Sequence, residues 1–380
     1  MHSYPAGNTL SSTKAIIPGI QLLLDAFKPT SYRLFGLPQI LPKSVVLIST
    51  FKCNSRCKTC NIWQKYVKNP SLESQEMTLD EFIIFIDNNE FLQDINLSGG
   101  EVYLRDDIVD MWQYLDCKGL ATAVTTNGVN VDLIKRKESI LLKKLSGKNN
   151  RELQISIDGL GETHDFIRGI SGNYEKAIEL LNWAFRKERQ YPFFKVSITH
   201  NITPYNYHQL SEFVKYFINF GLKPSQISIK VAQTSSLLYD NIDTYEFVNS
   251  SRKMISAVEG IQREIPYYRH YYYTRLIPTF LENSRKPLIP CYAGFTICYI
   301  DPCWNVYPCS FLNTKIGNLR DYNFELKKLW ETDVIKKVQD RVKKGLCPHC
   351  WISCFSSPSI RCDVFSLLRF GIRKLIQRDL

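Results

Sequence analysis

Three cysteines lie within one short segment, Cys53, Cys57 and Cys60, directly after an apolar run at residues 44–50. That run predicts a buried strand, so the cysteines occupy the loop that follows it. A four-iron cluster normally takes four thiolates, and a structural zinc site also closes with four ligands. Three thiolates leave one metal position free to bind something else. The spacing therefore predicts a catalytic metal centre rather than a structural clamp.

Polar or glycine-rich residues stand at the ends of the next predicted strands. The candidates are Gly99, Gly100 and Glu101 after the second strand, Asn127 after the third, Ser156 and Asp158 at the fourth, and Arg168 beyond it. Glycine lets backbone approach a ligand closely, a carboxylate accepts from an amine, and arginine binds a carboxylate as a fork. Taken singly, each is equally compatible with a tight turn or a surface ion pair. Their recurrence at successive strand ends predicts one shared site.

Strand-like and helix-like segments alternate from residue 44 to about residue 232, which indicates an α/β fold with a parallel sheet. The capping box at residues 78–81 predicts the start of one helix, and Asn173 is a candidate cap for another. Six units predict a partial parallel (β/α)6 barrel, in which all strand ends carrying these residues share one face. The predicted strands are residues 45–49, 94–97, 122–125, 153–158, 194–199 and 227–231.

The CxxxCxxC loop, followed by Gly-Gly-Glu, Thr-Thr-Asn-Gly and Ser-Ile-Asp-Gly at successive strand ends, resembles the radical S-adenosylmethionine (radical SAM) superfamily. The resemblance implies that one [4Fe–4S] cluster is bound, and that its free iron chelates the amino and carboxylate groups of S-adenosyl-L-methionine. Reductive cleavage would yield a 5′-deoxyadenosyl radical that abstracts a substrate hydrogen. The implied cluster ligands are Cys53, Cys57 and Cys60, and the implied cofactor-binding residues are Gly99, Gly100, Glu101, Asn127, Ser156, Asp158 and Arg168.

A second group of cysteines follows near the C-terminus. Cys291 and Cys309, followed by Cys347 and Cys350, can close four ligands around one centre, and zinc and iron–sulfur both fit this spacing. The module is similar to SPASM and twitch domains, which implies that these four cysteines bind an auxiliary [4Fe–4S] cluster. Cys354 either replaces one of the four or binds a second centre.

Other residues of this module leave alternatives open. Cys298, Cys303 and Cys362 either complete a second auxiliary cluster or are ordinary thiols. Trp304 stands where the resembled domains usually have glycine, which puts the hairpin there in question. Cys117 stands apart from both groups and is expected to be a small buried residue.

Five segments are expected along the chain. The tyrosine-rich stretch at 267–273 either packs on the barrel or stacks on nucleic-acid bases. Both basic amphipathic ends either pack on the body of the protein or lie on a membrane surface. The segments are an N-terminal amphipathic helix and arm (1–43), the core barrel (44–240), a helical linker (241–286), the cysteine-rich module (287–362) and a basic amphipathic tail (363–380).

The composition of the chain indicates its cellular compartment and the kinds of molecule it binds. The net charge of +11 is not concentrated in a dense basic run, which argues against nucleic acid. Twelve cysteines without a secretory signal favour metal binding in a reducing cytoplasm over disulfides. No apolar stretch approaches the ~20 residues that a spanning helix needs.

The resulting expectation is an oxygen-sensitive radical SAM enzyme that takes electrons from an external donor such as a flavodoxin or ferredoxin. An auxiliary cluster would help it to complete an oxidation or a bond formation. The favoured substrate is a sugar, a polyol or a cofactor precursor, because the 52 residues before Cys53 do not read as a peptide-recognition domain. The alternatives are maturation of a ribosomally made peptide and a zinc-dependent RNA-binding protein.

Overall fold

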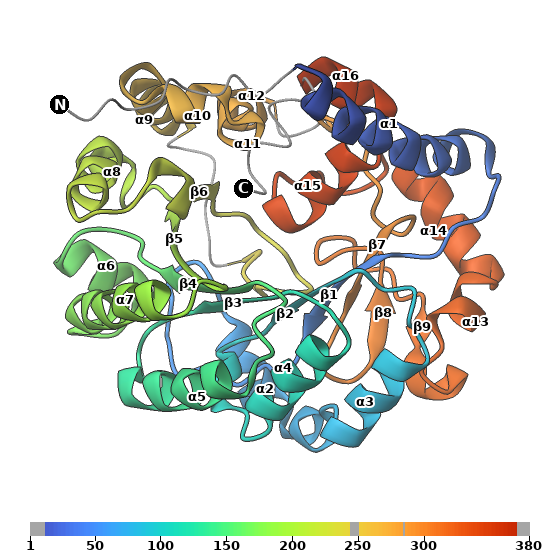
Figure 1. Cartoon of the computed structure of the whole chain (residues 1–380), viewed down its shortest axis with the longest axis horizontal. Helices are drawn as coiled ribbons and strands as arrows, with labels where there is room; N and C mark the ends of the chain where they lie inside the picture. The colour runs from blue at the N-terminus through green and yellow to red at the C-terminus, as the bar shows by residue number, and fades with distance from the viewer. Residues whose placement is uncertain (1–11, 244–250, 284–285, 371–380) are drawn as a thin grey trace, which may run out of the picture.

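A computed structural model describes residues 12–243, 251–283 and 286–370. Parallel pairing joins β1 to β2, and separately joins β3, β4, β5 and β6 in that order. β2 and β3 lie next to each other, so the six strands form the predicted partial barrel (Figure 1). The strands are β1 (Ser44–Ile48), β2 (Asp94–Ser98), β3 (Thr122–Thr126), β4 (Arg151–Ser156), β5 (Phe194–Ile202) and β6 (Ile227–Val231).

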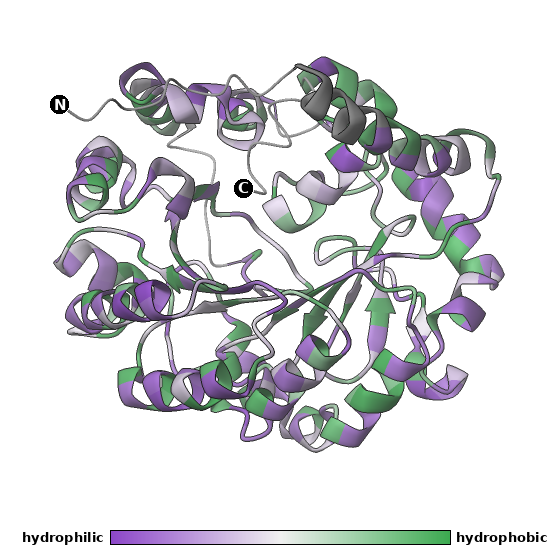
Figure 2. Ribbon diagram, in the orientation of Figure 1, coloured by the Kyte–Doolittle hydropathy of each residue, from purple (hydrophilic) through white to green (hydrophobic). Residues whose placement is uncertain are grey.

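Amphipathic helices cover the outside of this barrel, and each carries purple and green residues in Figure 2. The predicted capping box opens α3: the Thr78 hydroxyl accepts from the Glu81 amide at 3.2 Å. Asn173 does not cap α7, because its side chain turns inward and donates to the Asn127 carbonyl at 3.2 Å. The helices are α2 (Lys65–Lys68), α3 (Leu79–Asp87), α4 (Ile108–Cys117), α5 (Val131–Lys144), α6 (Glu162–Arg168), α7 (Asn173–Gln190) and α8 (Leu210–Asn219).

The cysteine-rich region extends the sheet of the barrel. β7 (Ile297–Ile300) pairs in parallel with β1, and β8 (Asn305–Tyr307) and β9 (Gly317–Asn318) follow antiparallel. The segment boundary at residue 287 stays a prediction, since β7 shares its sheet with β1 and β2. The helices that follow are α13 (Leu326–Trp330), α14 (Asp333–Lys343), α15 (Ser353–Arg361) and α16 (Val364–Phe370).

The hairpin between β7 and β8 forms although a tryptophan occupies its turn. Trp304 has φ +66°, a left-handed conformation that glycine adopts more easily. Its ring is fully buried between Phe85 and Phe324, and its indole nitrogen donates to Glu81 at 3.1 Å. Burial of the ring therefore offsets the strain at this position.

The described part of the predicted linker is mostly helical. Tyr268 and Tyr273 are buried, and the Tyr273 ring stacks on Trp351 with centroids 5.3 Å apart. The aromatic stretch thus packs inside the protein rather than presenting its rings to bases. The helices are α9 (Ser251–Glu264), α10 (Pro266–His270), α11 (Tyr272–Arg275) and α12 (Ile277–Glu282).

The two ends of the chain meet. Helix α1 (Ser12–Phe35) lies beside α16, and the Thr30 hydroxyl donates to the Cys362 carbonyl at 3.2 Å (Figure 1). Residues 371–380 of the predicted tail lie outside the described residues.

Cys117 is exposed, so the expectation that it is buried was wrong. It is the last residue of α4, where its side chain reaches solvent. Among the described helices, none has the length and apolar character that crossing a membrane requires.

Candidate functional site

The Cys53–Cys60 loop is fastened along one side to the end of β2. The Gly100 amide donates to the Thr50 carbonyl at 2.9 Å, and the Glu101 amide donates to the Lys52 carbonyl at 2.8 Å. A Cβ atom on Gly100 would lie 2.2 Å from the Lys52 carbonyl oxygen and 2.9 Å from the Cys53 Cβ. Glycine is therefore required here by the close approach of the chain's own cysteine loop.

The other side of the loop is fastened to the end of α6. Amides of Arg56 and Lys58 donate to the carbonyls of Arg168 and Ile167 at 3.0 and 2.8 Å. Gly169, with φ +68°, caps the end of α6, and a Cβ there would lie 2.3 Å from the Arg56 carbonyl oxygen. Backbone hydrogen bonds on both sides thus hold the cysteine loop over the end of the barrel.

Glu101 is a buried carboxylate that only neutral donors contact. It accepts from the Thr126 hydroxyl at 3.0 and 3.1 Å and from the Asn127 amide at 2.8 Å. Burial raises the pKa of Glu101 to about 7, although these hydrogen bonds act to lower it. No salt bridge reaches Glu101 from the residues that the structure describes. A bound cation, such as an ammonium group, would complete this site.

Three further candidates converge on the thiols. The Asn127 side-chain amide lies 3.8 Å from the Cys53 sulfur. One Arg168 nitrogen lies 3.8 Å from the Cys57 sulfur, and another pairs with the Asp158 carboxylate at 2.8 Å. The structure therefore brings β3, β4 and α6 residues to the cysteine loop, as the strand-end pattern predicts.

The remaining residues of this face have supporting positions. Ser156 is buried at the end of β4 and contributes no hydrogen bond to this network. His164 has a structural role: Nδ1 accepts from the Asp158 amide at 3.0 Å and burial lowers its pKa to about 3. The Trp63 ring, in the segment directly after the cysteine loop, is covered by the Arg56 guanidinium at 4.4 Å. Thr126 was not singled out in the sequence, although it lies within the Thr-Thr-Asn-Gly motif.

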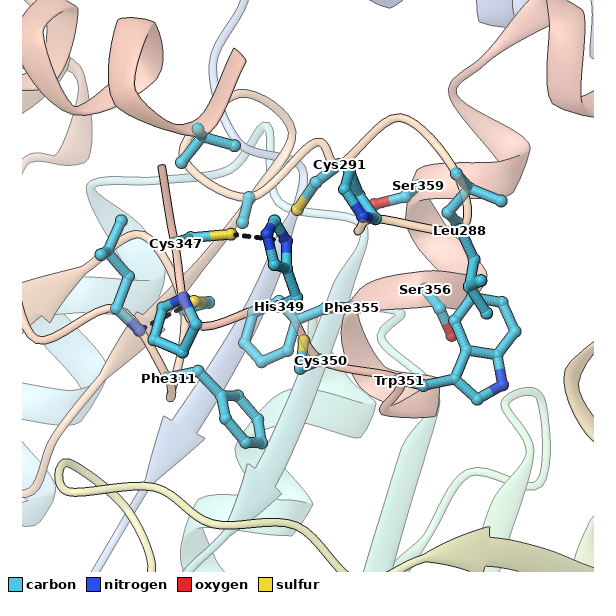
Figure 3. A pocket seen from close by; sticks show the side chains of 17 residues that line it. Leu288, Cys291, Phe311, Cys347, His349, Cys350, Trp351, Phe355, Ser356 and Ser359 are labelled. Atoms are coloured by element: carbon cyan, nitrogen blue, oxygen red, sulfur yellow. Dashed lines mark hydrogen bonds between the residues drawn. The ribbon is translucent and has the colours of Figure 1, made fainter. Parts of the chain in front are cut away.

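A second cysteine site is a pocket in the C-terminal region. The four cysteines predicted for one auxiliary centre all line it, together with Phe311 and Phe355 (Figure 3). They come from the loop before β7, the loop after β8 and the segment before α15. Residues far apart in the sequence are thus gathered around one small space: Cys291, Cys309, Cys347 and Cys350.

The lining of this pocket separates the remaining candidate ligands of the C-terminal region. Cys354 does not line it, whereas His349, with φ +54°, points into it and lies 3.6 Å from the Cys347 sulfur (Figure 3). Sequence reasoning passed over His349, although it stands between the two cysteines of the CxxC pair. Cys298 is buried on the other side of the sheet, in the core under the barrel helices, away from the apolar cluster that holds Cys362. The structure therefore does not bring Cys298 and Cys362 together as ligands of a second auxiliary iron–sulfur cluster.

A polar row lines the inner face of the barrel. The Thr125 hydroxyl donates to Gln154 at 3.2 Å, Gln154 donates to Ser197 at 3.4 Å, and the Lys230 ammonium donates to Gln154 at 3.0 Å. Thr125 is exposed in β3, so solvent reaches this row. The alternating polar positions of β6, Ser228 and Lys230, were the available signal in the sequence.

The donor sets fit iron–sulfur clusters better than single ions. Within residues 12–243, 251–283 and 286–370, no three His, Cys, Asp or Glu side chains converge as ligands of one metal ion. In a [4Fe–4S] cluster each thiolate binds a different iron, so wider spacing is expected. Burial raises the pKa of Cys53 to about 11 and that of Cys309 to about 12, so thiolates there need a cationic partner.

Comparison with known proteins agrees with this geometry. Residues 47–217 match the family described as the Radical SAM superfamily. An AdoMet-dependent heme synthase of Methanosarcina barkeri is 26% identical over 334 residues, which cover 81% of this chain and 88% of the relative. The mycofactocin maturase MftC of Mycobacterium tuberculosis is 25% identical over 317 residues, covering 79% of this chain and 73% of the relative.

Solved structures share the fold at low identity. SuiB of Streptococcus suis bound to S-adenosylmethionine superposes with a TM-score of 0.54 at 16% identity, covering 79% of this chain and 68% of SuiB. The structure of anSMEcpe with bound AdoMet gives 0.54 at 16% identity, covering 89% and 97%. Residues 47–217 are therefore a radical SAM domain, and the protein is an enzyme whose cofactors are a [4Fe–4S] cluster and AdoMet. Its cysteine-rich C-terminal region fits an auxiliary cluster domain.

Proposed function

We propose that this enzyme oxidises a carboxylate-bearing cofactor precursor by hydrogen abstraction. When bound, the cluster and AdoMet supply a 5′-deoxyadenosyl radical that removes a substrate hydrogen. Cys53, Cys57 and Cys60 would hold the cluster, and Glu101 would accept the ammonium group of AdoMet. Support comes from the buried position of Glu101, which has no cationic partner among the described residues, directly beside the cysteine loop.

The other cofactor contacts are assigned by proximity. Asn127 and Arg168 both reach cysteine sulfurs, so they would hold polar groups of AdoMet near the open metal position. Asp158 orients the Arg168 guanidinium through their ion pair and would itself face the ribose. Gly99 and Gly100 would act through the backbone, by holding the cysteine loop close to Glu101. Ser156 would add a hydroxyl at the end of β4.

The polar row inside the barrel is the observation that carries the substrate class. Lys230 offers a positive charge, and Thr125, Gln154 and Ser197 offer neutral hydrogen-bonding groups beside it. Such a surface suits a polar substrate with a carboxylate, which an ammonium group binds as a point charge. The relatives include proteins named AdoMet-dependent heme synthase and pre-heme d1 synthase. A sugar or polyol without a carboxylate would make less use of Lys230.

The auxiliary pocket would complete the oxidation. Cys291, Cys309, Cys347 and Cys350 would hold a second [4Fe–4S] cluster, whose chemistry when bound is to accept the electron left after hydrogen abstraction. Phe311 and Phe355 line the same pocket and would limit access of water to it. We also assign the enzyme a cytoplasmic location and an external one-electron donor of the flavodoxin or ferredoxin type.

A peptide is the second candidate substrate. It is favoured by the MftC relatives, which are named as maturases, and by neighbours solved with peptides, such as SuiB bound to its precursor SuiA. A peptide C-terminus would offer Lys230 the same carboxylate. The tyrosine-rich stretch packs inward, which argues against the alternative of a zinc-dependent RNA-binding protein.

Anaerobic purification with iron, sulfide and 5′-deoxyadenosine measurements tests the proposal. We expect about eight irons per chain, from two four-iron clusters, and loss of 5′-deoxyadenosine formation in Cys57→Ala. Lys230→Met should leave substrate-free cleavage of AdoMet intact and remove its stimulation by porphyrin carboxylates. Stimulation by peptides alone would favour the second candidate, and an iron-free protein without cleavage after reconstitution would refute both.

A further inference from the structure

The two ends of the chain form an apolar and basic surface outside the catalytic site. Helix α1 exposes Leu24, Phe27, Leu34 and Phe35, with Phe27 66% exposed. At 100° per residue these side chains fall on one stripe of the helix. The opposite side of α1 is used for folding, because Ala26, Thr30 and Tyr32 are buried against the body.

Helix α16 exposes a second stripe beside the first. Phe365 and Leu368 are exposed at i and i+3, while Leu367 and Phe370 are buried. The two helices pack side by side, and the Val364 amide donates to the Thr30 hydroxyl at 3.1 Å (Figure 1). Figure 2 shows hydrophobic residues on both helices at this edge of the molecule. Large apolar side chains are therefore exposed together at one corner of the molecule. Soluble monomers rarely expose such an apolar patch unless it binds something.

Positive charge surrounds these stripes. Lys28 on α1, Arg361 and Arg369 around α16, and Lys343 on the adjoining α14 are all exposed. Lys343 belongs to the same face, since its ammonium donates to the Leu34 carbonyl at 2.8 Å. The exposed acid of α1, Asp25, accepts from Gln21 at 3.0 Å. The amino-acid sequence beyond α16 continues the mixture, with Ile372, Leu375 and Ile376 among Arg373, Lys374 and Arg378.

We propose that this surface, defined by the exposed side chains of α1 and α16 and their basic rim, binds an anionic lipid surface. Aromatic and aliphatic side chains on one face with lysine and arginine at the edge are the features of helices that lie in a membrane interface. Each basic residue near an anionic bilayer adds attraction that salt weakens. The net charge of +11 acts in the same direction. A second copy of this chain, equally basic, would meet this face with like charge.

Vesicle co-sedimentation with the cluster-loaded full-length protein tests this. We expect binding to phosphatidylglycerol-containing vesicles that is weakened by salt, and no binding to phosphatidylcholine alone. The double variant Phe27→Ser with Phe365→Ser should bind about tenfold less, and so should Lys28→Gln with Arg369→Gln. Ile140→Ser, an exposed apolar residue on α5, is the matched control and should bind like the wild type.

Three further measurements distinguish lipid binding from misfolding and from self-association. Thermal melting and 5′-deoxyadenosine formation, both unchanged in the variants, would show that folding and the catalytic site are intact. Equal binding to both kinds of vesicle, or to neither, would overturn the proposal. Light scattering that reveals a dimer, dissolved by the double phenylalanine variant, would assign the surface to self-association instead.

Discussion

Replacing Glu101 with glutamine separates cofactor binding from stability. Burial raises the pKa of this carboxyl from 4.5 to about 7, so the folded protein without ligand keeps it protonated below that pH. That rise corresponds to about 3 kcal/mol of unfavourable free energy when the group is ionised at alkaline pH. Glutamine carries no charge there, but its nitrogen cannot accept from Thr126 or Asn127, at a loss of about 1 kcal/mol.

Glu101→Gln should therefore unfold with a free energy about 2 kcal/mol higher than the wild type at pH 8, in the absence of AdoMet. Because the folded pKa is the higher one, the folded state binds the extra proton between pH 4.5 and about 7. Wild-type stability consequently falls as pH rises through this window, and the advantage of the variant should disappear below it. Denaturant titration at several pH values under anaerobic conditions measures this.

Binding of AdoMet should change in the opposite direction. Loss of the carboxylate removes a charge-assisted hydrogen bond to the ammonium group, worth about 1.5–3 kcal/mol, so affinity should fall about tenfold to a hundredfold. Isothermal titration of cluster-loaded protein measures it, with the exposed Glu179→Gln on α7 as control. Unchanged affinity, or a variant less stable than wild type at pH 8, would refute the assignment of Glu101.

Three further substitutions test other parts of the structure. Gly100→Ala forces a Cβ against the Lys52 carbonyl and should prevent cluster assembly at the first site, measured as loss of about four irons per chain. Cys350→Ala should also lose about four irons, whereas Cys354→Ala should keep them, and equal losses would return Cys354 to the ligand set. Trp304→Gly relieves about 1–2 kcal/mol of left-handed strain but empties a buried ring site worth about 3–5 kcal/mol. Denaturant unfolding should show net destabilisation, and a gain in stability would contradict the balance of strain and packing.

The barrel could be predicted from the sequence because buried strands appear in it as short runs of apolar residues. Each predicted strand lies within a few residues of an observed one, and residues 227–231 coincide with β6. Polar residues at the ends of such strands can be placed on one face from topology alone. This is why the amino-acid pattern was enough to group Glu101, Asn127, Asp158 and Arg168 with the cysteine loop.

What the sequence did not reveal depends on contacts between distant segments. Gly100 is needed for the chain's own loop, and this close approach is visible only when β2 and the loop are placed together. Cys350 precedes α15 and Cys354 lies in its first turn, yet only Cys350 lines the pocket. The sequence allowed α1 either to pack on the body or to lie on a membrane. Its two faces are compatible with both.

The two cysteine sites share one apolar cluster, which couples their integrity. Phe51 and Ile62 beside the first site pack in the same cluster as Phe311 beside the second. Tyr239 bridges them: its carbonyl accepts from the Asn61 amide at 2.7 Å, and its ring meets Phe311 with centroids 6.3 Å apart. Because close-packed side chains transmit displacement, disorder in the auxiliary pocket would reach the loop that holds Cys60. The C-terminal region therefore supports the barrel in two ways. Its strand β7 extends the sheet of the barrel, and its apolar side chains complete the hydrophobic cluster that packs behind the cysteine loop.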